Sequence, residues 1–213
     1  MNKNPIMLAE AEEPAHRNKG YFQMDYGWTF QGLIRDIYSG KKNALDFQNY
    51  YNADKQKFMN GWHMYFTSNH DENSWAGTEF EKLGSSHQMF SVLTFTLDGI
   101  PLIYSGQEEP LKKKLAFFEK DNIDFGQYAY VPFYKNLCTL RKNNKALYSG
   151  TFGGPIDWIQ NDKTQQIISF KRSKDDTEIL VVMNMSPQII ETQLSDLSTG
   201  KYVEYFSSKK IKI

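Results

Sequence analysis

Short apolar runs alternate with amphipathic segments over the first two thirds of the chain. The apolar runs lack a clean alternation of polar and apolar positions, which is typical of parallel strands buried on both faces. We therefore predict a parallel sheet whose strands are separated by helices. The strands are expected at residues 6–9, 21–26, 63–67 and 101–104.

Apolar residues recur at helical spacing in three segments, residues 28–40, 86–97 and 130–147. In the first segment Phe30 and Ile34 fall on one face, and Gly40 is suited to end the helix. The second segment is apolar on nearly every side, so we expect a buried helix with Ser85 or Ser86 as its N-cap. Alternating strands and helices predict an α/β fold.

The pattern changes after Leu147. Short β-rich runs follow one another and are separated by turn-forming pairs such as Gly-Gly, Asn-Asp and Ser-Pro. This pattern is typical of antiparallel strands. We therefore divide the chain into an α/β part over residues 1–147 and an all-β antiparallel sandwich domain over residues 148–213.

Composition and charge exclude some classes of function. The formal net charge is zero, with 25 basic and 25 acidic residues. No broad basic face is predicted, so nucleic-acid binding is not expected. No apolar run reaches the roughly 18 residues of a membrane-spanning helix. Cys138 is the only cysteine, which excludes an internal disulfide, and we expect it on the apolar stripe of a helix.

Acidic and amide side chains follow the expected strands: Glu10, Asp25, Asp71, Gln107 and Glu108. Active sites of parallel α/β sheets lie at the C-terminal ends of the strands. Paired carboxylates there are the usual machinery of glycoside hydrolysis, and nearby aromatic rings would stack on sugar rings. Lone acids after strands are also common, so composition alone leaves a structural role for Glu10 open.

A metal site is the competing use of the acids in "FTSNHDENSW", residues 66–75. Adjacent residues at a strand end point in different directions. No H-x-x-x-H or C-x-x-C spacing supports zinc. We therefore predict no metal site around His70.

Three motifs give the chain a resemblance to a known family. "FTSNHDE" (66–72) resembles the F-x-x-N-H-D motif that ends the seventh barrel strand in the α-amylase family of glycoside hydrolases. "GIPLIYSGQE" (99–108) resembles the motif of that family's eighth strand, and "MLAEAE" (7–12) resembles that of the fifth. The resemblance extends to about Leu147; beyond it only the architecture is similar.

The resemblance implies roles for two carboxylates. Glu10 would be the general acid/base, and Asp71 would stabilise the oxocarbenium-like transition state by holding sugar hydroxyls. "AEAEE" also offers Glu12 and Glu13. Because the apolar run ends at Ala9, Glu10 comes first at the rim, and we favour it.

Residues around these two carboxylates are expected to bind the sugar. The resemblance makes His70 a hydrogen-bond donor to hydroxyls of the sugar at the cleavage point. We expect Asn69, Trp75, Asp25 and Tyr26 to line the same substrate site.

The sequence departs from the family in one respect. The family's nucleophile is an Asp that ends the fourth strand, two residues after an Arg. Only "LIRDI" (33–37) places an Arg near an Asp, and there the spacing is wrong. A whole (β/α)8 barrel takes about 250 residues. We therefore expect strands five to eight of such a barrel, without the nucleophile and inactive alone.

The expected function is that of a fragment of a retaining α-glucan hydrolase that acts on α-1,4-linked glucose polymers or maltooligosaccharides. Two alternatives stay open: a glucan transferase or isomerising enzyme of the same family, and a non-catalytic carbohydrate-binding module. The resemblance implies no cofactor in these residues. Family members often bind calcium, mostly through segments that have no counterpart here.

The partner expected from the resemblance is an α-glucan oligosaccharide or starch. A half-barrel would leave the strands at 6–9 and 101–104 with one unpaired edge each. Unpaired edges recruit other chains. We therefore expect self-association through these edges, or binding of the missing half.

Overall fold

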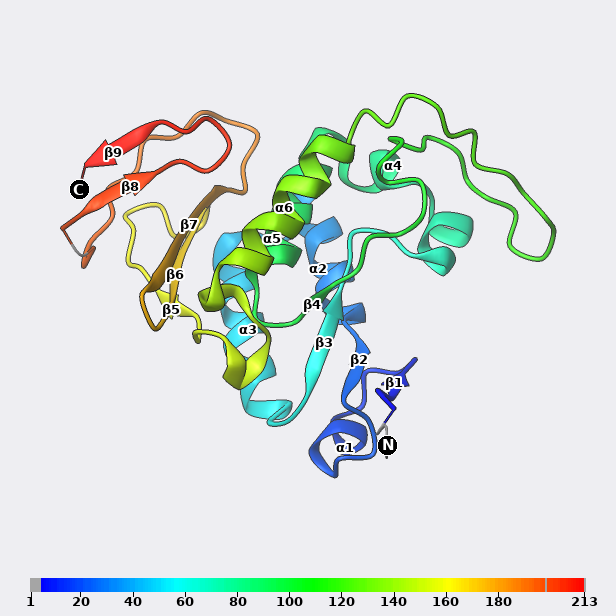
Figure 1. The fold of residues 1–213 in the computed structure, drawn as a ribbon, viewed down its shortest axis with the longest axis horizontal. Coiled ribbons are helices and arrows are strands. Elements are labelled where there is room, and N and C mark those ends of the chain that lie inside the picture. Colours follow the sequence, from blue (N-terminus) through cyan, green and yellow to red (C-terminus); the bar gives the residue numbers. More distant parts are fainter. Residues whose placement is uncertain (1–4, 198, 213) are drawn as a thin grey trace.

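A parallel sheet forms the centre of the α/β part of the molecule (Figure 1). The computed structural model describes residues 5–197 and 199–212. The strands pair in chain order, all parallel: β1 (Leu8–Ala9), β2 (Met24–Tyr26), β3 (Trp62–Tyr65) and β4 (Ile100–Pro101). The four predicted strands are therefore present, although the paired segments are shorter than the apolar runs that predicted them.

Helices follow the strands and cover one face of the sheet. Their bounds are α1 (Pro14–Asn18), α2 (Trp28–Tyr38), α3 (Ala44–Lys57), α4 (Glu79–Leu83), α5 (His87–Thr96) and α6 (Val131–Asn143). The three predicted helices form as α2, α5 and α6. Gly40 follows the C-cap Ser39 and has a φ of 75°. Ser86 takes the N-cap position of α5, but its side chain makes no capping hydrogen bond.

The hydrophobic pattern missed helix α3. Its apolar face is weak, but its start carries a reciprocal capping box. The Asn43 side chain accepts hydrogen bonds from the backbone N–H groups of Leu45 and Asp46, at 2.9 and 3.2 Å. The Asp46 carboxylate in turn accepts from the Asn43 N–H at 2.9 Å. This local signal could have predicted where the helix begins.

A buried ionic chain joins α1, β2, β3 and α3. Nη1 of Arg17 donates to Oδ1 of Asp25 at 3.0 Å, and Nδ1 of His63 lies 2.7 Å from the same oxygen. Nε2 of His63 lies 3.0 Å from Oδ2 of Asp54. Burial alone lowers the pKa of His63, but hydrogen bonds to the two carboxylates outweigh it and raise the pKa above its usual value. The raised pKa favours an imidazolium at His63, whose positive charge offsets the negative charges of the two carboxylates, although Oδ2 of Asp25 has no hydrogen-bond partner among the described residues.

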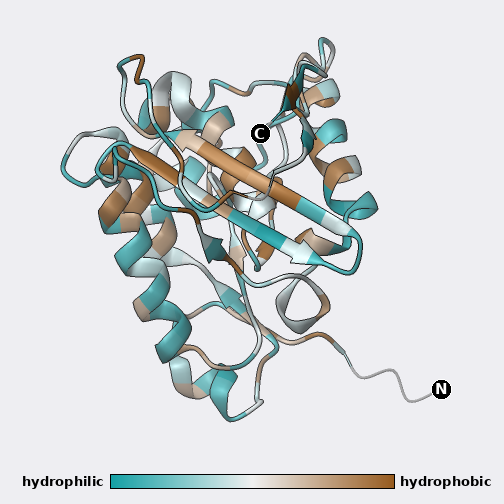
Figure 2. Ribbon diagram, turned by 90° about the vertical axis from the view of Figure 1, so that its left-hand side faces the viewer, coloured by the Kyte–Doolittle hydropathy of each residue, from teal (hydrophilic) through white to brown (hydrophobic). Residues whose placement is uncertain are grey.

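The C-terminal part is antiparallel, as predicted. One sheet contains β5 (Asp157–Trp158), β6 (Ile167–Lys174) and β7 (Thr177–Asn184), and a second contains β8 (Lys201–Val203) and β9 (Lys210–Lys212). Figure 2 shows the apolar halves of β6 and β7 side by side, where Ile168 pairs with Met183 and Phe170 with Val181. These four side chains pack with Phe30, Phe47 and Leu93 into one core shared with the helices.

Arg172 on β6 ties this sheet to the end of α5. The side chain is fully buried, and Nη1 donates to the carbonyl oxygens of Thr96 and Leu97 at 3.0 and 2.8 Å. Nε donates to Gly154 O at 2.8 Å and Nη2 to Tyr148 O at 2.6 Å. The last carbonyls of a helix have no partner within the helix. Arg172 supplies donors for them from a distant part of the chain.

The central sheet is open on both sides within residues 5–197 and 199–212: β1 pairs only with β2, and β4 only with β3. At the start of β1 and just before it, the side chains of Ile6, Met7 and Leu8 are exposed. The two predicted open edges are therefore present, and self-association through them stays a prediction.

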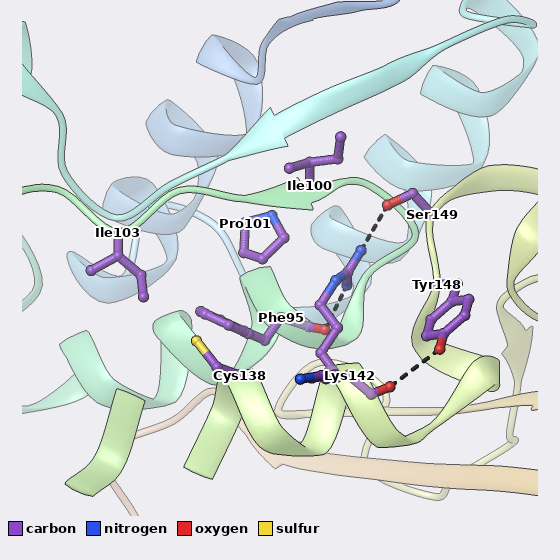
Figure 3. Close-up of a pocket in the computed structure, with 9 residues that line it drawn as sticks. Phe95, Ile100, Pro101, Ile103, Cys138, Lys142, Tyr148 and Ser149 are labelled. Atoms are coloured by element: carbon purple, nitrogen blue, oxygen red, sulfur yellow. Dashed lines mark hydrogen bonds between the residues drawn. The ribbon is translucent and has the colours of Figure 1, made fainter. Parts of the chain in front are cut away.

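A groove of about 570 Å³ lies along β4 (Figure 3), between Ile100 and Pro101 on one side and α6 on the other. Cys138 lines this groove and is exposed, so its predicted place on the apolar stripe of the helix is wrong. The buried residues of α6 are Leu137, Leu140 and Tyr134. Cys138 lies one position past this stripe.

In the part of the chain that the structure describes, no helix is both long enough and apolar enough to cross a membrane.

Arg172→Met should destabilise the fold by about 3 kcal/mol or more, because it leaves several buried carbonyl groups without donors. Urea unfolding followed by circular dichroism measures the loss. Lys174→Met, on the same strand, removes a partly exposed cation and should cost about 0.5 kcal/mol or less. Equal losses in the two variants would contradict this role for Arg172.

Candidate active site

Three side chains predicted for the site meet beyond the C-terminal ends of β1 and β3. Glu10 directly follows β1, and His70 and Asp71 lie in the segment that leaves β3. One carboxylate oxygen of each acid and one ring nitrogen of His70 all lie within 4.8 Å of one another. Parallel pairing of β1, β2 and β3 brings these residues together across about 60 positions of sequence.

Tyr26 lies beside the two acids. Burial raises the pKa of its hydroxyl, and the negative charges of Glu10 and Asp71 raise it further. Its ring stacks on Trp28, with centroids 5.3 Å apart, and meets the ring of Phe66 edge-on at 5.8 Å. Tyr26 therefore lies within the electrostatic field of both carboxylates, next to an aromatic wall.

Of the three neighbouring glutamates, only Glu10 lies with Asp71 and His70. The Glu12 carboxylate accepts hydrogen bonds from the backbone N–H and the hydroxyl of Thr29, at 2.7 and 2.8 Å, in the first turn of α2. Glu13 caps α1. Glu10 therefore belongs to this cluster, while Glu12 and Glu13 accept hydrogen bonds at the starts of helices.

Asp25 does not lie where a substrate-binding residue should, which corrects our expectation. Its side chain is 0% exposed and is engaged by Arg17 and His63. Neighbouring residues of a strand point to opposite faces. Since Tyr26 faces the two acids, Asp25 faces the helices. The sequence showed an acid at a strand end, but not the face to which it points.

Asn69 is buried and shapes the backbone of the segment after β3. Its side-chain oxygen accepts from the Glu72 N–H at 2.8 Å, and its backbone oxygen accepts from the Asn73 N–H at 2.9 Å. Nδ2 of Asn69 has no hydrogen-bond partner among the described residues. Asn69 thus fixes the turn that carries His70 and Asp71, and it keeps one free donor.

Glu72 acts as an anchor for the same segment. Its Oε2 accepts from Gln31 Nε2 and from Lys82 Nζ, both at 2.9 Å, and lies 3.6 Å from Nη1 of Arg35. These contacts tie the segment to α2 and α4. The adjacent acids therefore differ: Asp71 lies in the cluster with Glu10 and His70, whereas Glu72 fixes the segment to the helices.

Sequence reasoning missed Glu79, which links the ends of β3 and β4. Glu79 is buried, and its Oε2 accepts from the Thr67 hydroxyl at 3.1 Å and from Gln107 Nε2 at 2.7 Å. The same Gln107 amide donates to the Tyr134 hydroxyl at 3.1 Å. Burial raises the pKa of Glu79 above its usual value. Nothing in the local sequence indicates the two partners of Glu79, which come from separate segments of the chain.

Trp75 lies in a short π-helical turn, Glu72–Ala76, and is largely exposed. Its neighbours are aromatic rings of the long loop between β4 and α6. The structure thus places Trp75 near the site but beyond the acids.

Among the residues that the structure describes, two clusters contain residue types that could hold a metal ion. The Glu10, His70 and Asp71 cluster is the first, and Glu12, Asp54 and His63 form the second. Both ring nitrogens of His63 already face carboxylates. The first cluster is accessible to solvent, and its two acids are also suited to acid/base chemistry.

The chain is similar to enzymes that act on α-glucans. Residues 157–213 match the family described as Maltogenic Amylase, C-terminal domain. Alpha-amylase 2 of Dictyoglomus thermophilum is 25% identical over 218 residues, which cover 94% of this chain and 36% of the relative. The 1,4-alpha-glucan branching enzyme of Cellvibrio japonicus is 28% identical over 143 residues, covering 64% of this chain and 19% of the enzyme.

The fold is shared with a solved structure, the noncanonic maltogenic alpha-amylase AmyB from Thermotoga neapolitana. The TM-score is 0.80 at 20% identity, and the match covers 96% of this chain and 49% of that one. The chain thus spans about a third of the length of the first relative and about half of that structure.

Glu79→Gln should stabilise the protein by about 1 kcal/mol at pH 8, because the amide keeps an acceptor oxygen without a buried charge. A carboxyl whose pKa is raised by folding binds its proton more tightly in the folded state. The wild-type protein therefore gains stability as the pH falls through the folded pKa, and the advantage of Gln shrinks toward pH 5. Urea unfolding at several pH values measures this.

The exposed Glu119→Gln is the control and should change stability little at any pH. A pH-independent difference between Glu79→Gln and the wild type would contradict a pKa of Glu79 that is raised by folding.

Proposed function

Because this chain is related to the α-amylase family of glycoside hydrolases, we propose that it carries the acid/base part of a retaining α-glucan hydrolase site. The observation that carries the proposal is the meeting of Glu10, Asp71 and His70 at the C-terminal ends of two parallel strands. Active sites of (β/α)8 enzymes lie at this end of the strands.

Each group in the cluster has a role in the proposed reaction. Glu10 is exposed at the rim, so it can reach the glycosidic oxygen, protonate it, and later activate water. The Asp71 carboxylate stabilises the positive charge that develops on the sugar ring. Nε2 of His70 lies 3.5 Å from Oδ1 of Asp71 and donates to sugar hydroxyls next to it.

The nucleophile distinguishes two versions of this mechanism. Acid and nucleophile in retaining enzymes are about 5–5.5 Å apart, and the spacing of Glu10 and Asp71 alone is compatible with attack by Asp71. The family resemblance instead assigns attack to an Asp for which this sequence offers no match. We propose the second version, in which the nucleophile and the other barrel strands come from a segment outside these 213 residues.

The proposed substrates are α-1,4-linked glucose polymers or maltooligosaccharides. A glucan transferase is the second candidate, since a branching enzyme is among the relatives and the same carboxylates would serve both reactions. A carbohydrate-binding module without catalysis is the third. Product analysis of the assembled enzyme on starch and maltose separates hydrolysis from transfer.

Assayed alone on soluble starch, the 213-residue chain should release no reducing sugar above background, because no covalent glycosyl-enzyme can form without the nucleophile. Turnover by a homogeneous sample, abolished by Asp71→Asn, would instead assign attack to Asp71.

In the enzyme assembled with its complementary half, Glu10→Gln should lower kcat by about 100- to 10,000-fold while sparing starch binding. Asp71→Asn should lower it by about 100- to 1,000-fold through lost charge stabilisation. Initial rates on maltooligosaccharides measure both effects.

Glu12→Gln is the matched control, two residues from Glu10. Its carboxylate supports the first turn of α2, so its loss should cost about 1 kcal/mol of stability and little kcat. An inactive Glu12→Gln beside an active Glu10→Gln would overturn the assignment of the acid.

A further inference from the structure

Three aromatic side chains form an exposed patch beside the candidate active site. Trp75, Phe117 and Phe118 are 60%, 40% and 83% exposed. Their ring centroids lie 5.0 Å (Trp75 to Phe117), 5.9 Å (Trp75 to Phe118) and 4.8 Å (Phe117 to Phe118) apart. Single exposed apolar residues are common, but a contiguous group of large rings indicates a binding surface. We call this group the aromatic platform.

The platform is built from two distant segments that Asn73 holds together. The Asn73 side chain is buried; its oxygen accepts from the Leu115 N–H at 2.8 Å, and its Nδ2 donates to the carbonyl oxygen of Lys113 at 3.2 Å. Asp121 accepts from the Ala116 N–H at 3.0 Å and also pairs with the Lys113 ammonium. The backbone just before Phe117 is thus fixed on both sides. A fixed surface loses little conformational entropy when it binds a ligand.

The platform is continuous with the catalytic cluster. The His70 ring stacks on Phe117, with centroids 6.2 Å apart and an angle of 18° between the rings. His70 is therefore shared between the cluster of acids on one side and the aromatic surface on the other. A chain molecule bound at Glu10 and Asp71 could extend directly onto the platform.

The surroundings of the platform favour a neutral ligand. Three lysines precede it in the loop, and each has a partner within the chain. Lys112 lies 5.3 Å from the ring centroid of Phe80, Lys113 pairs with Asp121, and Lys114 donates to the carbonyl oxygen of Trp75 at 3.5 Å. This basic run is therefore engaged internally, which argues against an anionic ligand. The platform itself offers flat apolar faces, to which the C–H faces of a glucose ring are complementary.

We propose that Trp75, Phe117 and Phe118 form a subsite for a glucose unit of an α-glucan, away from the bond that Glu10 and Asp71 act on. The inference rests on the proposed function for the identity of the sugar. It assigns a binding role to Phe117 and Phe118 in the loop between β4 and α6, which extends away from the rest of the molecule in Figure 1. Asn73 is then a positioning residue for this subsite.

Isothermal titration of the 213-residue chain with maltoheptaose tests the proposal without requiring catalysis. Phe118→Ala and Trp75→Ala should each weaken binding by about tenfold or more. Both side chains are largely exposed, so circular dichroism should show an intact fold. Phe152→Ala, which removes an equally accessible ring elsewhere (67% exposed), should leave the dissociation constant unchanged.

Asn73→Ala tests whether Asn73 positions the loop that carries Phe117 and Phe118 or contacts the sugar itself. It should weaken maltoheptaose binding and also make the loop around Leu115 more sensitive to limited proteolysis, whereas Phe118→Ala should affect binding alone. Unchanged proteolysis with weakened binding would show that Asn73 contacts the sugar itself.

The proposal is overturned if the chain does not bind maltoheptaose at millimolar concentration, or if Phe118→Ala and Trp75→Ala bind as the wild type does. It is also overturned if the two variants abolish self-association of the chain and leave glucan binding intact, since the platform would then be a protein interface. Failure of the proposed function looks different: glucan binding is lost in Phe118→Ala, but Glu10→Gln leaves the assembled enzyme fully active.

Discussion

The placement of the candidate site depends on the buried ion pair between His63 and Asp25. Because these residues are register partners in β2 and β3, their contact locks the two strands on the side that faces the helices. Arg17 and Asp54 extend the pair to α1 and α3. Removing one member of such a buried group leaves an uncompensated charge in the interior, which is costly. The strands therefore hold their relative positions, and the side chains at their ends meet without contacts of their own.

In the segment after β3, neighbouring polar residues have different structural environments. Asn69 shapes the turn after β3, Glu72 anchors it to two helices, and Asp71 is left accessible between them. Glu79 adds a link to the segment after β4. An accessible carboxylate can be held in one place only if buried groups around it take up the hydrogen bonds of the backbone.

Sequence patterns predicted the four strands of the central sheet and the helices α2, α5 and α6. They found α2 because its apolar residues lie on one face, and α5 because it is apolar on nearly every side. They missed α3, because its apolar residues form only a weak stripe even though several of them are buried. They also misplaced Asp25, because a position at the end of a strand does not reveal which face of the sheet the side chain is on. Glu79 could not be predicted either, since its partners come from segments that only the fold brings together. The motifs around Glu10 and Asp71 were visible because several adjacent residues together resemble known family motifs.

Arg172 has a consequence for how such chains evolve. The change of pattern after Leu147 suggests a domain boundary at which one C-terminal domain could be exchanged for another. The donors for the last carbonyl groups of α5 nevertheless come from Arg172 on β6, in the C-terminal part of the chain. An exchanged C-terminal part would be tolerated only if it placed a hydrogen-bond donor of its own beside the last carbonyl groups of α5. The two parts of the chain are thus expected to be inherited together, as one unit of selection, even though their sequences read as separate modules.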